Sequence, residues 1–193
     1  VPDTAEFQGP SGRGAPRALL QTLARSHSGM RVILTGITGN LGSEIFRTLR
    51  RHGHQVIPLI RAKNKEEAFE RLRATFIEEV SFPQIIVSDL LERRPSFVSN
   101  VGDCIIHCAG AVRLKNSKTR NARMASNTSL LAGELRIPLY HISTAFVWRP
   151  DDSTFRNEYE KDKAESEKIV ADSKIPWAIF RPSILTGDSA NGR

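Results

Sequence analysis

Two side chains near the C-terminal end of the sequence have the spacing of an acid catalyst and its partner. Tyr159 and Lys163 stand four residues apart in a segment that is predicted to be helical, so both project from one face about one turn apart. A lysine ammonium near a phenol favours phenolate and lowers the pKa of the phenol from about 10 towards neutral pH. The pair suits acid catalysis, although an exposed helix face is the simpler interpretation of the spacing alone.

Two hydroxyl groups strengthen the catalytic interpretation. Ser143 ends a predicted strand over residues 139–143, and Thr144 follows it. In an open parallel sheet, ligands bind beyond the carboxyl ends of the strands. A hydroxyl there can hold a substrate carbonyl, so we expect it to form one site with Tyr159 and Lys163.

A glycine-rich loop earlier in the sequence predicts a dinucleotide-binding site. Gly36, Gly39 and Gly42 lie between a predicted strand and a predicted helix. Gly36 permits a sharp turn, Gly39 lets the backbone approach a pyrophosphate, and Gly42 lets the helix pack closely on the strand. The helix start adds unpaired amides and the positive end of the dipole. The loop residues predicted to bind the cofactor are Gly36, Thr38, Gly39, Asn40, Leu41 and Gly42.

Cationic residues after the second predicted strand favour NADP(H) over NAD(H). Arg61 stands where an enzyme specific for NAD usually presents an acidic residue to the ribose 2′-hydroxyl. Arg61, with Lys63 or Lys65, can pair with a 2′-phosphate. A solvated surface arginine is the alternative interpretation.

The residues after the third and fourth predicted strands complete the expected cofactor site. Asp89 and Leu90 follow the third strand, and the carboxylate of Asp89 can accept a hydrogen bond from the adenine amino group. Cys108, Ala109 and Gly110 follow the fourth strand and are small enough to let a cofactor backbone come close.

These residues require a sheet that presents all its strand ends on one edge. Apolar strand-like segments alternate with amphipathic helical segments, which predicts right-handed parallel crossovers and a sheet covered on both faces. The predicted class is α/β, a Rossmann-type doubly wound parallel sheet in three layers over residues 30–193. The predicted strands are 31–35, 56–60, 85–87, 104–108, 139–143 and 177–180, and the predicted helices are 41–51, 65–80, 122–135 and 158–172.

Residues 1–29 are interpreted as an N-terminal arm or linker outside the fold. The first part is rich in glycine and proline, and residues 17–25 predict one short helix. The arm lacks the apolar core of a signal peptide, and no segment of the chain approaches the 18 to 20 apolar residues, roughly, of a membrane span.

The composition narrows the range of partners. The formal net charge of +7 suits an anionic partner, but the Arg and Lys residues are scattered and do not predict nucleic-acid binding. Cys104 and Cys108 lie in an apolar segment and are expected in a buried strand, with no metal site or disulfide. A reducing cytoplasm is the expected location.

Taken together, these motifs resemble the extended short-chain dehydrogenase/reductase superfamily. Within it, residues 141–147 and 181–189 are similar to the thioester reductase and fatty acyl-CoA reductase branch. The resemblance covers residues 31–193 and implies NADPH-dependent reduction of an acyl thioester, on CoA or a carrier protein, to an aldehyde or alcohol. The motifs that carry it are TGxxGxxG (35–42), Arg61, Asp89-Leu90, Ser143-Thr144-Ala145, Tyr159-x-x-x-Lys163 and Arg181-Pro182-Ser183.

The resemblance also implies a role for each site residue. Thr144, with Ser143 as the alternative, would hydrogen-bond the carbonyl oxygen, and Tyr159 would donate the proton as hydride arrives. Lys163 would bind the nicotinamide ribose and tune Tyr159. The segment that would shape the pocket near the nicotinamide is Arg181, Pro182 and Ser183.

Three departures from the superfamily pattern stand out. Asp162 precedes Lys163 where serine is frequent, the stretch 112–143 is shorter than such domains usually carry, and the chain ends soon after Asp188. We therefore expect the chain to lack most of the C-terminal substrate-binding portion.

Two other functions stay open. An extended-family sugar-nucleotide epimerase or dehydratase, or an alcohol-type dehydrogenase, is the first alternative. A non-catalytic NADP-binding domain is the second. No oligomeric state is predicted.

Overall fold

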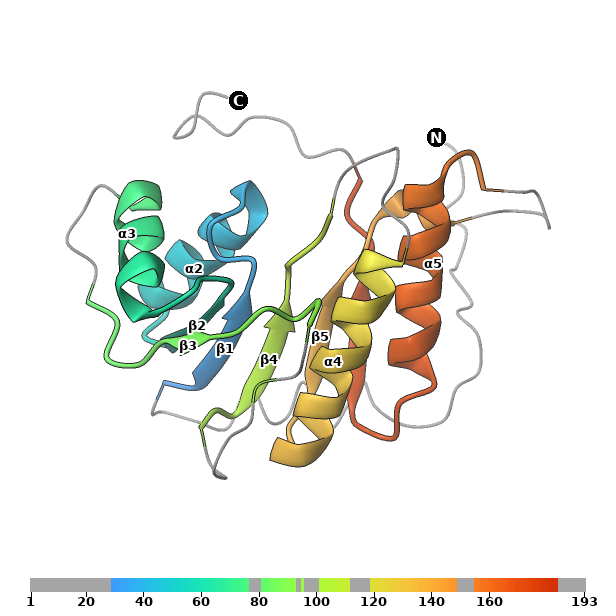
Figure 1. Cartoon of the computed structure of the whole chain (residues 1–193). Helices are drawn as coiled ribbons and strands as arrows, with labels where there is room; N and C mark the ends of the chain where they lie inside the picture. The colour runs from blue at the N-terminus through green and yellow to red at the C-terminus, as the bar shows by residue number, and fades with distance from the viewer. Residues whose placement is uncertain are drawn as a thin grey trace, which may run out of the picture.

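The computed structural model describes residues 29–76, 81–92, 95, 101–111, 119–148 and 155–183. Its parallel strands form one sheet in the order β3-β2-β1-β4-β5-β6 (Figure 1). This order is that of the Rossmann fold, so the predicted fold class is confirmed. The strands are β1 (Arg31–Thr35), β2 (Gln55–Ile60), β3 (Ile86–Val87), β4 (Cys104–His107), β5 (Leu139–Ile142) and β6 (Trp177–Phe180). The helices are α2 (Asn40–Arg51), α3 (Lys65–Thr75), α4 (Arg120–Leu135), α5 (Glu158–Ala171) and the short 3-10 helix η1 (Ala145–Val147).

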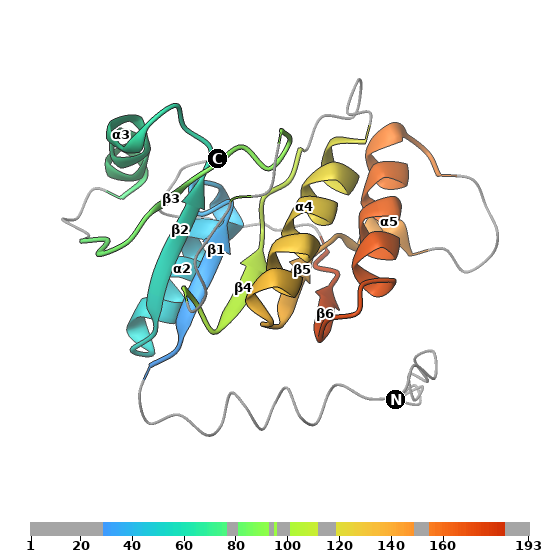
Figure 2. The same cartoon turned by 60° about the horizontal axis from the view of Figure 1, so that its bottom comes forward.

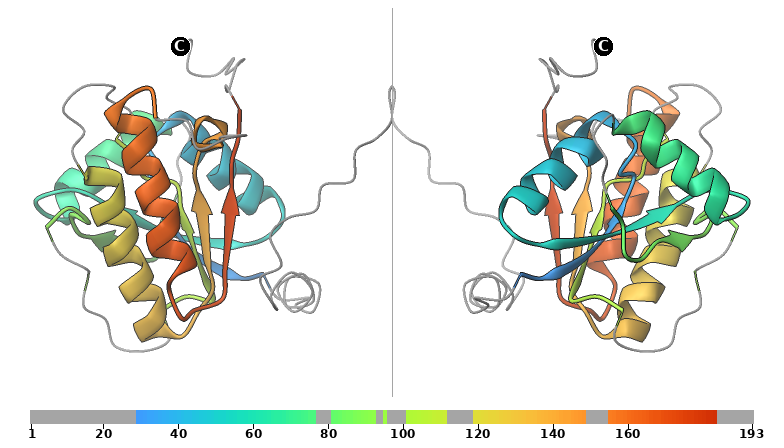
Figure 3. Two further views of the ribbon diagram at one scale, coloured as in Figure 1. Left: turned by 90° about the vertical axis from the view of Figure 1, so that its right-hand side faces the viewer. Right: turned by 90° about the vertical axis from the view of Figure 1, so that its left-hand side faces the viewer.

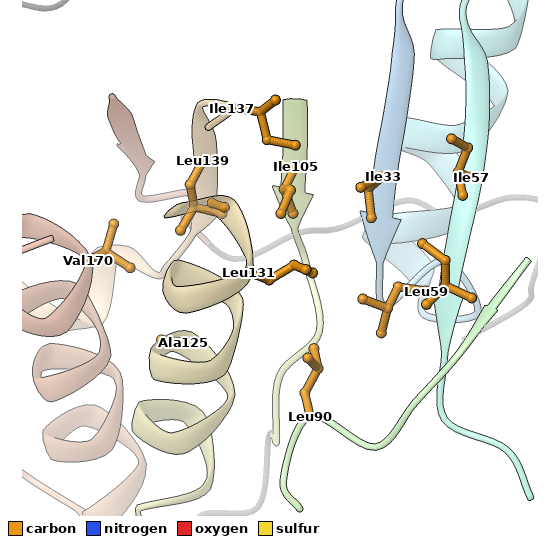
Figure 4. Packing of buried hydrophobic residues seen from close by; sticks show 12 residues of the cluster. Ile33, Ile57, Leu59, Leu90, Ile105, Ala125, Leu131, Ile137, Leu139 and Val170 are labelled. Carbon is orange, nitrogen blue, oxygen red and sulfur yellow. The ribbon is translucent and has the colours of Figure 1, made fainter. Parts of the chain in front are cut away.

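Helices cover the sheet on two faces, as Figure 3 shows with the sheet seen between them. Alternate residues of each strand point to opposite faces. Leu34, Val56 and Ile60 pack against α2 and α3, in one cluster with Phe46 and Leu72. The adjacent strand positions point to the other face and pack against α4 and α5, where the labelled residues of Figure 4 form a second cluster. The residues shown there include Ile33, Ile57, Ile105, Leu131, Leu139 and Val170.

Helix α3 ends earlier than the sequence predicts. The backbone leaves the helix at Phe76, which is extended with φ −116° and ψ 105°, whereas the helix was expected to reach residue 80. Leaving the helix lets the buried ring of Phe76 pack against Phe46 and Phe82, with centroids 4.6 and 6.2 Å away. Phe69 of the same helix is 38% exposed although it is apolar. It is one residue past buried Ala68, so the helix turns it away from the core.

The other predicted elements agree with the structure to within two residues at each end, and η1 was not predicted. Residues 1–28 of the predicted arm over 1–29, with its short helix at 17–25, lie outside the described residues, as do residues 184–189. Within the described segments, no helix combines the length and apolar character that crossing a membrane requires.

Candidate active site

One pocket of about 920 Å³ lies along the carboxyl ends of the strands. Parallel strands bring their carboxyl ends to one edge of the sheet, so segments far apart in the sequence meet there. Most of the predicted site residues line this pocket. They are Gly36, Thr38, Gly39, Asn40, Leu41, Gly42, Arg61, Asp89, Leu90, Cys108, Ala109, Gly110, Ser143, Thr144, Tyr159, Lys163, Pro182 and Ser183.

The glycine loop is packed as tightly as its sequence predicts. Gly36 has φ +71°, and a Cβ there would come within 2.6 Å of the Ala109 nitrogen. A Cβ on Gly42 would lie 2.0 Å from the Gly36 carbonyl oxygen, so the first turn of α2 rests directly on the loop. Gly39 is different, because a Cβ there would meet only the Gly36 oxygen at 3.4 Å. The loop therefore closes on its protein side and stays open around Gly39.

A buried threonine joins this loop to the segment after β4. The Thr35 hydroxyl accepts hydrogen bonds from the backbone nitrogens of Cys108 and Ala109, at 3.1 and 3.0 Å. Thr35 Oγ1 also lies 2.8 Å from His107 Nδ1, on the neighbouring strand. Sequence reasoning missed this role of Thr35 and His107, since it depends on β1 and β4 being neighbours in the sheet.

Cations gather at the end of β2. Arg61 and Arg71 line the main pocket and also a smaller adjoining pocket of about 600 Å³, which Lys63 lines too. The guanidinium of Arg71 donates to the Arg61 carbonyl oxygen, so α3 holds this cation over the strand end. Lys65 lines neither pocket and is exposed as the first residue of α3, so its cofactor contact stays a prediction.

Arg71 was not predicted because its sequence neighbourhood does not distinguish it from other charged residues of α3. It lies three residues after buried Ala68, which places it at the border of the buried face. Only the position of α3 against β2 shows that this border faces the strand end. Other pocket-lining residues that the sequence analysis missed include Arg120, Met124 and Phe146.

Tyr159 and Thr144 meet at the other end of the pocket. The first turn of α5 is set by Asn157, whose side chain accepts from the backbone nitrogen of Glu160 at 2.9 Å. This start leaves Tyr159 half-buried, with a side-chain hydrogen bond to Thr144. Burial raises the pKa of Tyr159, and the bond with Thr144 opposes that rise only in part. The lowering of this pKa by Lys163 stays a prediction for the site with a cofactor bound.

Lys163 is buried beneath the pocket, 4% exposed. Its Nζ donates to the carbonyl oxygen of Ile142, at the end of β5, over 2.8 Å. Burial lowers the pKa of Lys163 to about 8, against the opposing effect of Glu167 above all. The ammonium is thus fixed at the end of β5, and its pKa lies close to neutral pH.

Ser143 lines the pocket, whereas Arg181 does not. Ser143 is 6% exposed, and its Oγ is itself buried and has no hydrogen-bond partner among the described residues. The guanidinium of Arg181 donates to both oxygens of Glu167 on α5, at 2.6 to 3.1 Å, and its cofactor contact stays a prediction.

The chemistry available here is hydrogen bonding and proton transfer beside a long, partly cationic pocket. Thr144 and Tyr159 can both donate to a carbonyl oxygen, and the phenol can give up its proton. Three glycines and the amides at the start of α2 suit a pyrophosphate at the middle of the pocket. No group of three or more His, Cys, Asp or Glu side chains that could hold a metal ion occurs in the described segments.

Comparison with known proteins places these features in a family. The sequence model of the NAD dependent epimerase/dehydratase family matches residues 32–191. The chain is 26% identical over 171 residues to methionine adenosyltransferase 2 subunit beta of Bos taurus, covering 82% of this chain and 48% of that protein. It is 28% identical over 195 residues to the hybrid PKS-NRPS synthetase pydA of Acremonium sp, covering 86% of this chain and 5% of that protein.

Solved structures agree with the sequence comparison. The reductase domain of the aureusimine biosynthetic cluster superposes with a TM-score of 0.66 at 25% identity, covering 79% of this chain and 48% of that one. The PhqB reductase domain of Penicillium fellutanum gives 0.61 at 23% identity, covering 86% of this chain and 52% of that one. The Bordetella bronchiseptica enzyme WbmG, solved in complex with NAD, gives 0.61 at 17% identity, covering 81% of this chain and 54% of that one.

The chain spans about half the length of these solved structures and of the adenosyltransferase subunit. The resemblance to the extended short-chain dehydrogenases/reductases is confirmed by the family match together with the likeness to reductase domains. With its glycine loop, its Tyr-x-x-x-Lys pair and a match over most of its length, this chain belongs to the NAD dependent epimerase/dehydratase family.

Proposed function

We propose that this chain binds NADP(H) in the pocket at the strand ends. The pocket volume of about 920 Å³ is within the range of small-molecule and cofactor sites. The glycine loop fits a pyrophosphate, because Gly36 and Gly42 have no room for a side chain while the space around Gly39 is open. Lys163 at the far end of the pocket would hold the nicotinamide ribose.

The preference for NADP(H) over NAD(H) rests on Arg61 and Arg71. Both guanidinium groups belong to side chains that line the smaller pocket beyond the end of β2, where a ribose 2′-phosphate would bind. Two acidic residues of that pocket are already engaged by backbone amides. Glu67 accepts from the Lys63 nitrogen at 2.9 Å, and Asp89 accepts from the Leu91 nitrogen at 2.9 Å.

The proposed reaction is reduction of an acyl thioester, carried by CoA or a carrier protein, to an aldehyde or alcohol. When bound, the cofactor supplies the hydride. Thr144 and Tyr159 orient the substrate carbonyl by hydrogen bonds, and Tyr159 donates its proton to the carbonyl oxygen as negative charge develops there, which gives a hemithioacetal. The C–S bond of the hemithioacetal then breaks, its hydroxyl proton passes to the departing sulfur, and the aldehyde and the free thiol of CoA or the carrier are released. An alcohol requires a second hydride and a second proton. Lys163, as an ammonium, stabilises the phenolate that remains. Ser143 is the alternative donor to the carbonyl oxygen.

The observation that carries this proposal is the convergence of Thr144, Tyr159 and Lys163 on the pocket that contains the glycine loop. The likeness to two reductase domains and to a hybrid synthetase supports a reductase over an epimerase. A non-catalytic nucleotide-binding role is the second candidate. It is favoured by the 26% identity to a protein named as a subunit of methionine adenosyltransferase.

A hydride-transfer assay tests the reaction. NADPH oxidation is followed with an acyl-CoA series and a carrier-bound acyl thioester as separate substrates. Conversion of a nucleotide sugar is followed separately by chromatography, because an epimerase or dehydratase consumes no net NADPH. We expect turnover of the thioesters, and a fall in kcat of about 10²- to 10⁴-fold in Tyr159→Phe, because the general acid is lost. Tyr140→Phe is the matched control, since Tyr140 is the other tyrosine of the sequence and lies on β5 beside Phe180. Turnover of the nucleotide sugar alone, or an unchanged rate in Tyr159→Phe, rules the proposed reaction out.

A further inference from the structure

Asp162 lies between Tyr159 and Lys163 on α5, and its carboxylate is turned towards α4. It is 4% exposed. One carboxylate oxygen accepts from the backbone nitrogen of Asn121 at 2.8 Å and from the Asn121 side-chain nitrogen at 2.9 Å. The other oxygen accepts from the backbone nitrogen of Ala122 at 3.0 Å. A carboxylate buried this deeply is stable only when such donors surround it.

Asp162 replaces the cap that α4 does not have in its own sequence. The residue before α4, Thr119, is left-handed with φ 54° and makes no side-chain capping bond. Helices α3 and α5 differ, because Asn64 and Asn157 cap them from within their own chain segments. The first amides of α4 are instead satisfied from the neighbouring helix, and the negative charge of Asp162 also suits the positive end of the α4 dipole. Figures 1 and 2 both show α4 and α5 side by side.

Asn121 extends this contact to the wall of the pocket. Asn121 is 2% exposed. Its side-chain oxygen accepts from the Ala111 nitrogen at 2.8 Å, and its side-chain nitrogen donates to the Ala111 carbonyl oxygen at 3.1 Å. Ala111 and the preceding residues Ala109 and Gly110 line the pocket after β4. One chain of hydrogen bonds therefore runs from α5, which carries Tyr159 and Lys163, through the start of α4 to residues 109–111, here called the pocket loop.

We infer that Asp162 and Asn121 are positioning residues that hold α5 against this loop and so fix the geometry of the nicotinamide half of the pocket. The inference rests on the proposed function. It accounts for an aspartate at a position where the superfamily frequently has serine. The adenine half is built by other residues, among them Arg61 and Arg71, which the network does not touch. Breaking the network should thus affect the two halves of the pocket differently.

Two ligands of different length separate the two halves. NADPH would fill the whole pocket, whereas adenosine 2′,5′-bisphosphate would occupy the adenine half alone. Both are titrated calorimetrically against the whole chain and its variants Asp162→Asn and Asn121→Ala. In Asp162→Asn, the side-chain NH2 group would replace one carboxylate oxygen, so a donor would face the N–H groups that this oxygen accepts from in the wild type. Asn121→Ala removes the bonds to Ala111 and leaves the backbone amides of α4 capped, so it serves where Asp162→Asn does not fold.

We expect both variants to bind NADPH at least about tenfold more weakly. The pocket loop loses the hydrogen bonds that hold it, so the nicotinamide half of the pocket no longer has the geometry that the ligand requires. Their affinity for the bisphosphate should stay within about twofold of the wild type. Asp172→Asn, the same change at the exposed C-terminal end of α5, should leave both affinities unchanged. Parallel weakening of both ligands, or no weakening of NADPH, overturns the inference. A wild-type chain that binds neither ligand overturns the proposed function, and the inference with it.

Discussion

Two histidines stack beneath the pocket without facing solvent. The rings of His107 and His141 have centroids 5.2 Å apart and an interplanar angle of 23°, and each residue is 1% exposed. His107 contacts the Thr35 hydroxyl, and His141 Nε2 lies 3.2 Å from Ser166 Oγ on α5. Burial lowers the pKa of His107 to about 3 and that of His141 to about 2. Both rings are therefore neutral in the folded protein and join the glycine loop to the catalytic helix.

The neutral pair should make the fold sensitive to acid. The unfolded chain takes up these protons near pH 6.5 whereas the folded chain does not, so the free energy of unfolding falls as pH drops below that value. Each histidine should contribute a slope of about 1.4 kcal/mol per pH unit down to its folded pKa. Urea unfolding at pH 7, 6 and 5 measures this slope, and His141→Gln should reduce it by one histidine's share. The exposed His52→Gln serves as control. Equal slopes in wild type and His141→Gln would refute the prediction.

At the scale of elements, the contact between the glycine loop and α2 determines how the loop can present its amides. The first turn of α2 has no side-chain cap, because Gly39 occupies that position. Gly42 instead lets the helix lie on the Gly36 carbonyl group, so close that a Cβ on Gly42 would be only 2.0 Å from the carbonyl oxygen. The unpaired amides of the helix start therefore face the open side of the loop, towards the pocket.

Two glycine-to-alanine substitutions should have opposite effects. In Gly42→Ala the new methyl meets backbone at 2.0 Å, so α2 must shift, and we expect a loss of about 1–3 kcal/mol in the free energy of unfolding. In Gly133→Ala, inside α4, the methyl meets only Ile175 at 3.7 Å, and we expect a gain of about 0.5–1 kcal/mol. Urea unfolding compares the two variants. A Gly42→Ala protein as stable as the wild type would show that the loop and helix are not in close contact.

Elements with a strong periodic pattern could be predicted from sequence, and so could the residues directly after them. The strand ends gave the positions of Arg61, Thr144 and the Cys108 segment, because parallel strands share one edge. The spacing of Tyr159 and Lys163 placed both on one face of α5. The end of α3 could not be predicted, since Phe76 leaves the helix for a tertiary contact with Phe46 and Phe82.

The parts of the site that sequence reasoning missed depend on how elements pack. Arg71 lies over β2 only because of where α3 sits, and Asp162 caps α4 only because α4 and α5 are neighbours. The ion pair of Arg181 was missed for the same reason. Arg181 follows β6, as predicted, but an acceptor on α5, Glu167, takes its guanidinium. Long-range pairs of this kind leave no periodic signal in one sequence.

At the scale of the whole molecule, the fold gathers residues from Thr35 to Ser183 around the pocket at the strand ends. Its two ends differ in chemistry. The end near β2 carries the cations Arg61 and Arg71, and the end near β5 carries the hydroxyls and the buried ammonium of Lys163. A dinucleotide with a phosphate at its adenosine end and a redox-active ring at the other matches this division.

Calorimetric titration of the whole chain with NADPH and with NADH tests that match most directly. We expect saturable binding of both nucleotides, with NADPH bound at least about tenfold more tightly, since a charge-assisted pair with the 2′-phosphate is absent from NADH. Arg61→Ala should remove most of this difference and leave NADH binding nearly unchanged. No saturable binding of either nucleotide at millimolar concentration would contradict the account. Equal affinities that Arg61→Ala does not alter would contradict the assignment of the cationic end.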